Sequence, residues 1–169
     1  MKNRFLIIAI VVIVTASAAY AAFAQNLIVN GTGTATGNWS VQITGITLAT
    51  SIGATNHNAV APSVAGDGLS ATFNVDLAYP GATASYDMTI KNNGNIPAKL
   101  STISDMTATN NAAPTYITYA VSGVAVNDTL AAGASTTARV TVTWAASAST
   151  NPSGANKSAT VTLGYIQNT

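Results

Sequence analysis

The sequence predicts an all-β fold, a single antiparallel β-sandwich of the jelly-roll or immunoglobulin-like kind. Apolar and polar residues alternate along most of the chain, which is typical of half-buried strands. Clusters of Gly, Pro, Asn and Asp separate the alternating stretches and predict turns. No stretch after Ala24 has a helical spacing of apolar residues. These three observations favour many short strands joined by tight turns, as in a sandwich.

The predicted strands follow one another at short intervals along the chain. Each combines alternation with Val, Ile, Thr or aromatic residues, which suit a pleated sheet. Trp39 and Trp144 fall in register with the apolar residues of their strands, so both are expected in the core. In chain order the strands are centred on Trp39-Val41-Ile43, Phe73-Val75-Leu77, Tyr86-Met88-Ile90, Ile96 to Ile103, Ile117-Tyr119-Val121, Val140-Val142-Trp144 and Val161-Leu163-Tyr165.

Two of the predicted turns have a specific chemistry. Pro80-Gly81 predicts a type II turn, because proline presets the first corner and glycine accepts a positive φ at the second. Asn93-Gly94 is expected to turn the preceding strand toward the segment from Ile96 to Ile103.

The amino terminus has the pattern of a secretory signal peptide. Lys2 and Arg4 precede an apolar run from Phe5 to Val14, and small residues follow. This order predicts export, with cleavage between Ala21 and Ala22 or, as an alternative, after Ala24. A second reading keeps the segment as a membrane anchor, since about 20 apolar or small residues can span a bilayer.

The composition limits the classes of function. The chain has only 6 Lys and Arg, 5 acidic residues and no Cys. Nucleic acid is not expected as a partner, because binding a phosphate backbone takes clustered positive charge. An exported domain without disulfides must be held by its core and by its neighbours. A surface with so few charges has little like-charge repulsion, which favours self-association.

The sequence offers no catalytic, cofactor-binding or metal-binding residues. His57 is the only histidine, and all acidic residues are scattered aspartates. A zinc site needs three or four His, Cys or carboxylate ligands, and no nucleophile motif accompanies His57. The protein is therefore expected not to be an enzyme and to need no cofactor.

Four asparagines could accept glycans in a glycosylating host. Asn30, Asn38, Asn127 and Asn156 each begin an Asn-x-Ser/Thr triplet. Such triplets also arise by chance in a chain this rich in Asn and Thr.

The segment after the signal peptide differs from the other predicted strands. Residues 26–37 alternate well but consist mostly of Gly, Thr and Ala, so a strand formed there buries little by itself. Leu27 and Val29 would anchor one face of it, and Gly31, Gly33 and Ala35 continue that face. These glycines suit a place where large side chains of a host sheet crowd up to the backbone. Ile28 lies between the two anchors.

Two interpretations of this segment remain open. It could be a first strand, or a flexible leader, of its own domain. It could instead complete the sheet of another copy, because an extended peptide satisfies the unpaired edge of a sheet. Head-to-tail contact of that kind does not close, so it would build a filament of identical subunits. The expected organisation is then a signal peptide at 1–21, a donor strand at 22–37 and a β-sandwich at 38–169.

Three short stretches resemble the TasA and camelysin group of exported proteins. They are Tyr20-Ala21-Ala22-Phe23, Asp76-Leu77-Ala78-Tyr79-Pro80-Gly81 and Ile90-Lys91-Asn92-Asn93-Gly94-Asn95-Ile96-Pro97-Ala98-Lys99. The group includes bacterial biofilm-matrix fibre subunits, and archaeal bundling pilins are similar in architecture. The resemblance implies a jelly-roll domain whose mature amino-terminal strand, about 22–37 here, inserts into the next subunit.

The resemblance covers about a third of the chain and has limits. This chain is shorter and far less charged than the matrix fibre proteins, so their partner and bundling surfaces are not implied. Camelysin has been described as a peptidase, but the residues here do not supply the ligands of a zinc peptidase.

The expected function is that of a secreted structural subunit of a pilus or biofilm-matrix fibre, used for cell or surface adhesion. Neighbouring filaments or cells would then be further partners. One alternative is a monomeric or membrane-anchored domain for adhesion or binding at the cell surface. Another is a type IV-like pilin that keeps its apolar helix.

Overall fold

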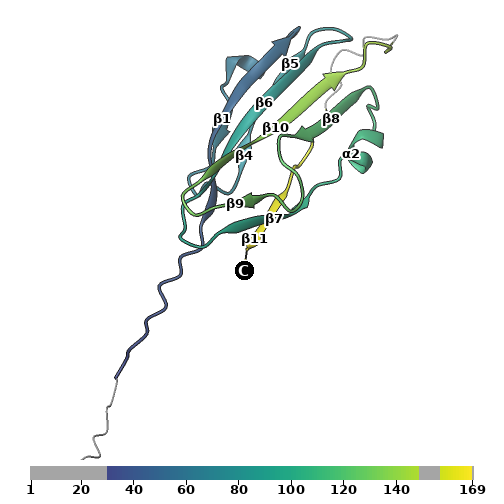
Figure 1. Ribbon diagram of the computed structural model, residues 1–169. Helices are drawn as coiled ribbons and strands as arrows, with labels where there is room; N and C mark the ends of the chain where they lie inside the picture. The colour runs from purple at the N-terminus through teal and green to yellow at the C-terminus, as the bar shows by residue number, and fades with distance from the viewer. Residues whose placement is uncertain (1–29, 149–156, 169) are drawn as a thin grey trace, which may run out of the picture. The chain divides into compact units, whose positions relative to one another are not determined.

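The structure is all-β, as predicted. The computed structural model describes residues 30–148 and 157–168. The chain divides into residues 1–35 and residues 36–169, and every described strand belongs to the second unit. In chain order the elements are β1 (Val41–Ile52), β2 (Ala54–Asn56), the 3-10 helix η1 (His57–Ala59), β3 (Ser63–Val64), β4 (Ala71–Thr72), β5 (Val75–Leu77), β6 (Thr83–Asn92), β7 (Ala98–Ile103), α2 (Thr107–Asn111), β8 (Ile117–Ser122), β9 (Thr129–Leu130), β10 (Ser135–Trp144) and β11 (Leu163–Gln167) (Figure 1).

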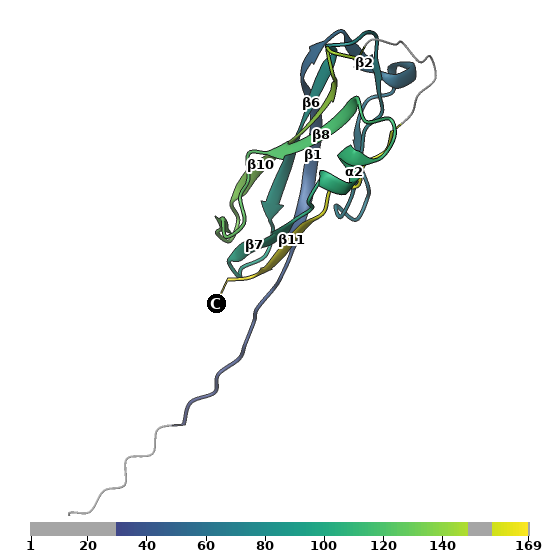
Figure 2. The ribbon, with the colours of Figure 1, turned by 90° about the vertical axis from the view of Figure 1, so that its right-hand side faces the viewer.

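A four-stranded antiparallel sheet forms the first layer, in the order β1-β6-β10-β8 (Figure 2). On β6 the inward residues Tyr86, Met88 and Ile90 are buried, as their alternation predicted. On the outward face of β6, Asp87 lies opposite Arg139 of β10, and Arg139 donates to both of its carboxylate oxygens at 2.6 and 2.8 Å. The period-two pattern therefore separates a core face from a polar face.

Smaller sheets cover the inner face of the first layer. They are a three-stranded sheet, β11-β7-β9, and the pairs β2-β5 and β3-β4. Their inward residues pack against the core, and the ring of Phe73 stacks on Tyr86 with centroids 4.2 Å apart. The fold is therefore sandwich-like, with the core between the four-stranded sheet and this divided second layer.

The short helix α2 was not predicted from the sequence. It has five residues and no buried side chain, so it carries no apolar periodicity. Asn110 attaches its end to β8: the side chain donates to the Tyr119 carbonyl at 2.9 Å and accepts from the Tyr119 N–H at 2.8 Å. Tertiary hydrogen bonds, which local sequence does not reveal, hold this turn of helix.

The turn at Pro80-Gly81 is confirmed. The Ala82 N–H donates to the Tyr79 carbonyl at 3.0 Å, and Gly81 has a φ of 95°. A positive φ at the second corner, after proline, is the geometry of a type II turn.

The connection after β6 is a corner between sheets and not a hairpin. β6 lies in the four-stranded sheet, whereas β7 lies in the three-stranded one. The fully buried Asn92 joins them, because its Nδ2 donates to the carbonyls of Ile96 (2.8 Å) and Leu130 (3.2 Å). Its Oδ1 accepts from the Gly94 N–H at 3.0 Å.

This corner also holds the start of the described domain. Asn95 donates from its side chain to the Thr36 carbonyl and exchanges hydrogen bonds with the main chain of Asn38. A Cβ at Gly94 would collide with the Asn38 carbonyl, so only glycine permits this approach. Residues 36–38 are therefore fixed to the body of the domain.

Replacing Asn92 with Ala should destabilise the domain strongly. The change removes the side-chain donor of the Ile96 and Leu130 carbonyls, at about 1–3 kcal/mol for each carbonyl that finds no new partner, whereas the Gly94 N–H keeps the Ser40 carbonyl at 3.2 Å. We expect urea unfolding to show a loss of about 3 kcal/mol in unfolding free energy. The exposed neighbour is the control: Asn93→Ala should cost less than about 0.5 kcal/mol. Equal effects of the two changes would contradict the role given to Asn92.

Candidate functional site

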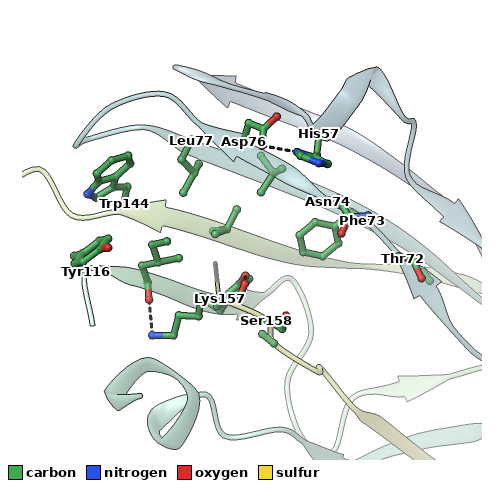
Figure 3. Close-up of a pocket in the computed structure, with 16 residues that line it drawn as sticks. His57, Thr72, Phe73, Asn74, Asp76, Leu77, Tyr116, Trp144, Lys157 and Ser158 are labelled. Carbon is green, nitrogen blue, oxygen red and sulfur yellow. Dashed lines mark hydrogen bonds and ion pairs between the residues drawn. The ribbon is translucent and has the colours of Figure 1, made fainter. Parts of the chain in front are cut away.

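A long groove opens in the second layer of the domain. It consists of two adjoining cavities, of about 550 and about 520 Å³, which share Ala71, Phe73, Tyr119 and Ala159. Residues 68–77 form one rim and residues 157–165 form the other. Figure 3 shows the first cavity, with Phe73 and Leu77 on one side and Lys157 and Ser158 on the other.

The two cavities differ in their floors, which come from the four-stranded sheet. We call the first the Trp144 half, whose own lining includes Trp144, Tyr116, Ile117 and Val142. The second is the Ile90 half, whose floor is aliphatic: Ile90, Met88 and Val140, with Val41 and Ile43 beside them. Trp39 and Tyr165 also line the Ile90 half. Aromatic side chains thus line both halves, whereas the charged side chains Asp76 and Lys157 line the Trp144 half alone.

Both rims of the groove carry strand edges that the structure pairs on one side only. β5 pairs with β2 and β4 with β3, which leaves their other edges toward the groove. On the opposite rim β11 pairs with β7, and residues 157–162 belong to no strand. Unpaired edges of this kind accept an added strand.

Along both rims, half-buried side chains alternate with exposed ones. The odd-numbered residues of 71–77 and of 159–165 are half-buried, and the even-numbered residues 72, 74, 76, 158, 160 and 162 are exposed. Each rim is therefore extended chain with an apolar face toward the core. An inserted strand would continue the second layer with its own alternation.

The indole N–H of Trp144 has no hydrogen-bond partner among the described residues. The side chain is 6% exposed and lines the groove, with the Tyr116 ring centroid 5.8 Å from its own (Figure 3). A buried donor left unpaired costs about 1–3 kcal/mol.

Lys157 fastens the second rim to the body of the domain. Its Nζ donates to the main-chain carbonyls of Asn110, Ala112, Pro114 and Ile117 at 2.7 to 3.0 Å. Burial lowers the pKa of Lys157 from its usual value. We call this set of hydrogen bonds the Lys157 latch, because it attaches the start of residues 157–162 to the α2 to β8 region.

Tyrosines strengthen the same rim. The Tyr119 hydroxyl donates to the Lys157 carbonyl at 2.6 Å. Burial raises the pKa of Tyr119, and burial followed by the charge of Asp128 raises that of Tyr165. Both phenols therefore remain neutral hydrogen-bonding groups at neutral pH.

His57 lies exposed at the rim of the Trp144 half. Its Nδ1 is 2.7 Å from Asp76, and its main-chain N–H donates to Asn74. A carboxylate can orient a histidine in this way for catalysis, but a nucleophile must then contact the other ring nitrogen. Within residues 30–148 and 157–168 the structure shows no serine hydroxyl bonded to that nitrogen, so the pair ties η1 to β5.

The predicted donor strand is only partly within the described residues. Leu27, Ile28 and Val29 lie outside them, as do the cleavage residues Ala21 and Ala22. Gly31, Gly33 and Ala35 are described: they are exposed and belong to no strand, with open space around both glycines. None of the helices that the structure describes is long and apolar enough to cross a membrane.

Three of the four predicted glycan acceptors are on the surface. Asn30, Asn38 and Asn127 are exposed, and Asn127 adopts a φ of 79° in the loop before β9. Asn156 lies outside the described residues.

Trp39 corrects one expectation from the sequence. It is 36% exposed and lines the groove, so its burial in the core was wrongly predicted. Alternation placed it on the inner face, but the second layer is open at that point. Sequence reasoning also missed Lys157, although a single lysine in a Ser- and Asn-rich stretch could have marked a specific contact.

Replacing Lys157 with Met should loosen the second rim. Methionine keeps the length and apolar stem but gives the four carbonyls no donor, so we expect a loss of about 1–2 kcal/mol in unfolding free energy. Hydrogen exchange of residues 157–162 should accelerate more than that of β6. Lys99→Met, which removes the same charge from β7, is the control. Unchanged exchange at residues 157–162 would contradict the latch.

The comparisons with known proteins found no matching family model, no similar curated protein and no similar solved structure. The resemblance to the TasA and camelysin group accordingly rests on the three short stretches quoted above. A function for this chain must follow from the chemistry of the groove and of the predicted donor segment.

Proposed function

We propose that the chain is a secreted structural subunit of an extracellular filament, a pilus or biofilm-matrix fibre, that polymerises by donor-strand complementation. Residues 22–37 of one subunit would fill the groove of the next. The observation that carries the proposal is the groove itself, an apolar floor between two rims of extended chain.

The main chain supports this assignment first. An extended segment lying between β5 and residues 157–162 would exchange hydrogen bonds with both rims. A helix or a compact ligand could not, because its polar groups do not match a row of strand edges. The occupant best suited to the groove is therefore another strand.

The side chains of the donor segment support it second. Leu27 and Val29 would point inward with Gly31, Gly33 and Ala35, because residues two apart share a face of a strand. Each fully buried Leu or Val side chain contributes roughly 1.5–3 kcal/mol. The small residues would add main-chain hydrogen bonds where the floor is too shallow for larger side chains.

Polymerisation follows from the use of two different surfaces. The donor and the groove are distinct parts of one chain, so every bound subunit still offers one of each. A heterologous contact that does not close propagates as a filament. The partners would be identical subunits, head to tail, and then neighbouring filaments or cells.

The same proposal includes the fold type of the subunit, its export and its role. The sandwich would be a jelly-roll or immunoglobulin-like domain completed by the donor, and the chain would reach the cell exterior by the signal peptide at 1–21. Its role would be structural and adhesive, without catalysis or cofactor. The pairing of His57 with Asp76 at the rim agrees with a structural use of the only histidine.

Replacing both Leu27 and Val29 with Asp should abolish filaments. Two carboxylates would have to enter an apolar groove without partners, which costs several kcal/mol. We expect association at least about 100-fold weaker, since each 1.4 kcal/mol is tenfold. Electron microscopy and sedimentation of the secreted protein measure this, and the variant should remain a soluble domain.

The matched control places the same two charges on the opposite face of the strand. Ile28→Asp with Asn30→Asp should leave filaments largely intact. Normal filaments from the Leu27 and Val29 variant would contradict the proposal, and so would equal loss in both variants. A wild-type protein that stays monomeric, with its own segment in its own groove, would support a monomeric surface domain instead.

A further inference from the structure

The two halves of the groove accept different kinds of side chain. The Trp144 half is lined by His57, Asp76 and Lys157 beside its aromatic rings, so polar and charged side chains border it (Figure 3). In the Ile90 half, the floor consists of smaller aliphatic side chains. Large apolar side chains suit the Ile90 half, where they would be buried among aliphatic groups, and the small residues of a Gly- and Thr-rich strand suit the more polar Trp144 half.

The donor segment has the same asymmetry along its length. Its large apolar residues, Leu27 and Val29, come first, and Gly31, Gly33 and Ala35 follow on the same face. The two patterns match in one direction only. We infer the direction of the donor, an inference that rests on the proposed function. Residues 27–29 lie in the Ile90 half of the next subunit, and residues 31–35 lie in its Trp144 half.

The position of the domain's first residues agrees with this direction. Residues 36–38 are fixed by Asn95, and Trp39 lines the Ile90 half, so each chain enters its own domain at that end of the groove. In the inferred direction the donor leaves the neighbour at the other end, beside Trp144. The donor and the neighbour's own residues 36–38 then lie at opposite ends of the groove and do not compete for space. Successive subunits therefore point the same way along the filament.

The direction specifies the pairing with each rim. Along residues 68–77 the chain runs from the Ile90 half to the Trp144 half, and along residues 157–165 it runs the other way. The donor is therefore parallel to the first rim and antiparallel to the second. Both rims are comparable in length with residues 27–35, so the segment can span the groove.

Engineered cysteine pairs test the direction, because the native chain has no Cys. The aligned pairs are Val29→Cys with Leu163→Cys, and Ala35→Cys with Leu77→Cys. The crossed pairs are Val29→Cys with Leu77→Cys, and Ala35→Cys with Leu163→Cys. Leu77 and Leu163 are both half-buried rim residues, one in each half. Each double variant is assembled, treated with a short bismaleimide and run on a denaturing gel.

The inferred direction predicts ladders of cross-linked multimers from both aligned pairs and at least tenfold less from both crossed pairs. In the crossed variants about six residues, or roughly 20 Å of strand, would separate the thiols. Ladders from the crossed pairs alone would overturn the direction and leave donor-strand complementation standing. Filaments without a ladder from any pair, or links only within one chain, would overturn both.

Single-cysteine variants at the four positions complete the experiment. They should give no ladder beyond a dimer, because each subunit then carries one thiol. Ladders from all four double variants alike would also overturn the inferred direction, since they would mean that the segment binds both ways.

Discussion

The structure depends on one constraint: extended chain with unpaired N–H and C=O groups must find partners. In the four-stranded sheet the central strands β6 and β10 pair on both sides, and β1 and β8 are its edges. In the second layer β5 and β11 each pair on one side only, and both contribute to the lining of the groove. An added strand would pair these free N–H and C=O groups, and we propose that residues 22–37 of another subunit supply it.

The groove remains open because its rims are held from behind. Lys157 binds four carbonyls of the α2 to β8 region, and the Tyr119 hydroxyl binds the Lys157 carbonyl. On the other rim the His57 and Asp76 side chains connect η1 to β5. Polar groups, few in this sequence, are thus used to position extended chain over an apolar floor. Rigid rims would reduce the ordering cost of receiving a flexible segment.

The long strands were predictable from sequence because alternation alone specifies them. Tyr86 and Val140 lie on buried faces as expected, and the turn at Pro80-Gly81 has the predicted geometry. The alternation of the rims was predicted at Phe73-Val75-Leu77 and Val161-Leu163-Tyr165, but their pairing with β2, β3 and β7 was not, because it depends on tertiary position. The buried bridge of Asn92 and the latch of Lys157 join segments distant in sequence, so no local pattern reveals them.

The most direct test is a cryo-EM map of the assembled protein at a resolution that shows side chains. The account predicts continuous density for residues 27–35 of one subunit between residues 68–77 and 157–165 of the next, with main-chain hydrogen bonds to both rims. A filament whose groove is empty, or is filled by its own chain, would contradict it.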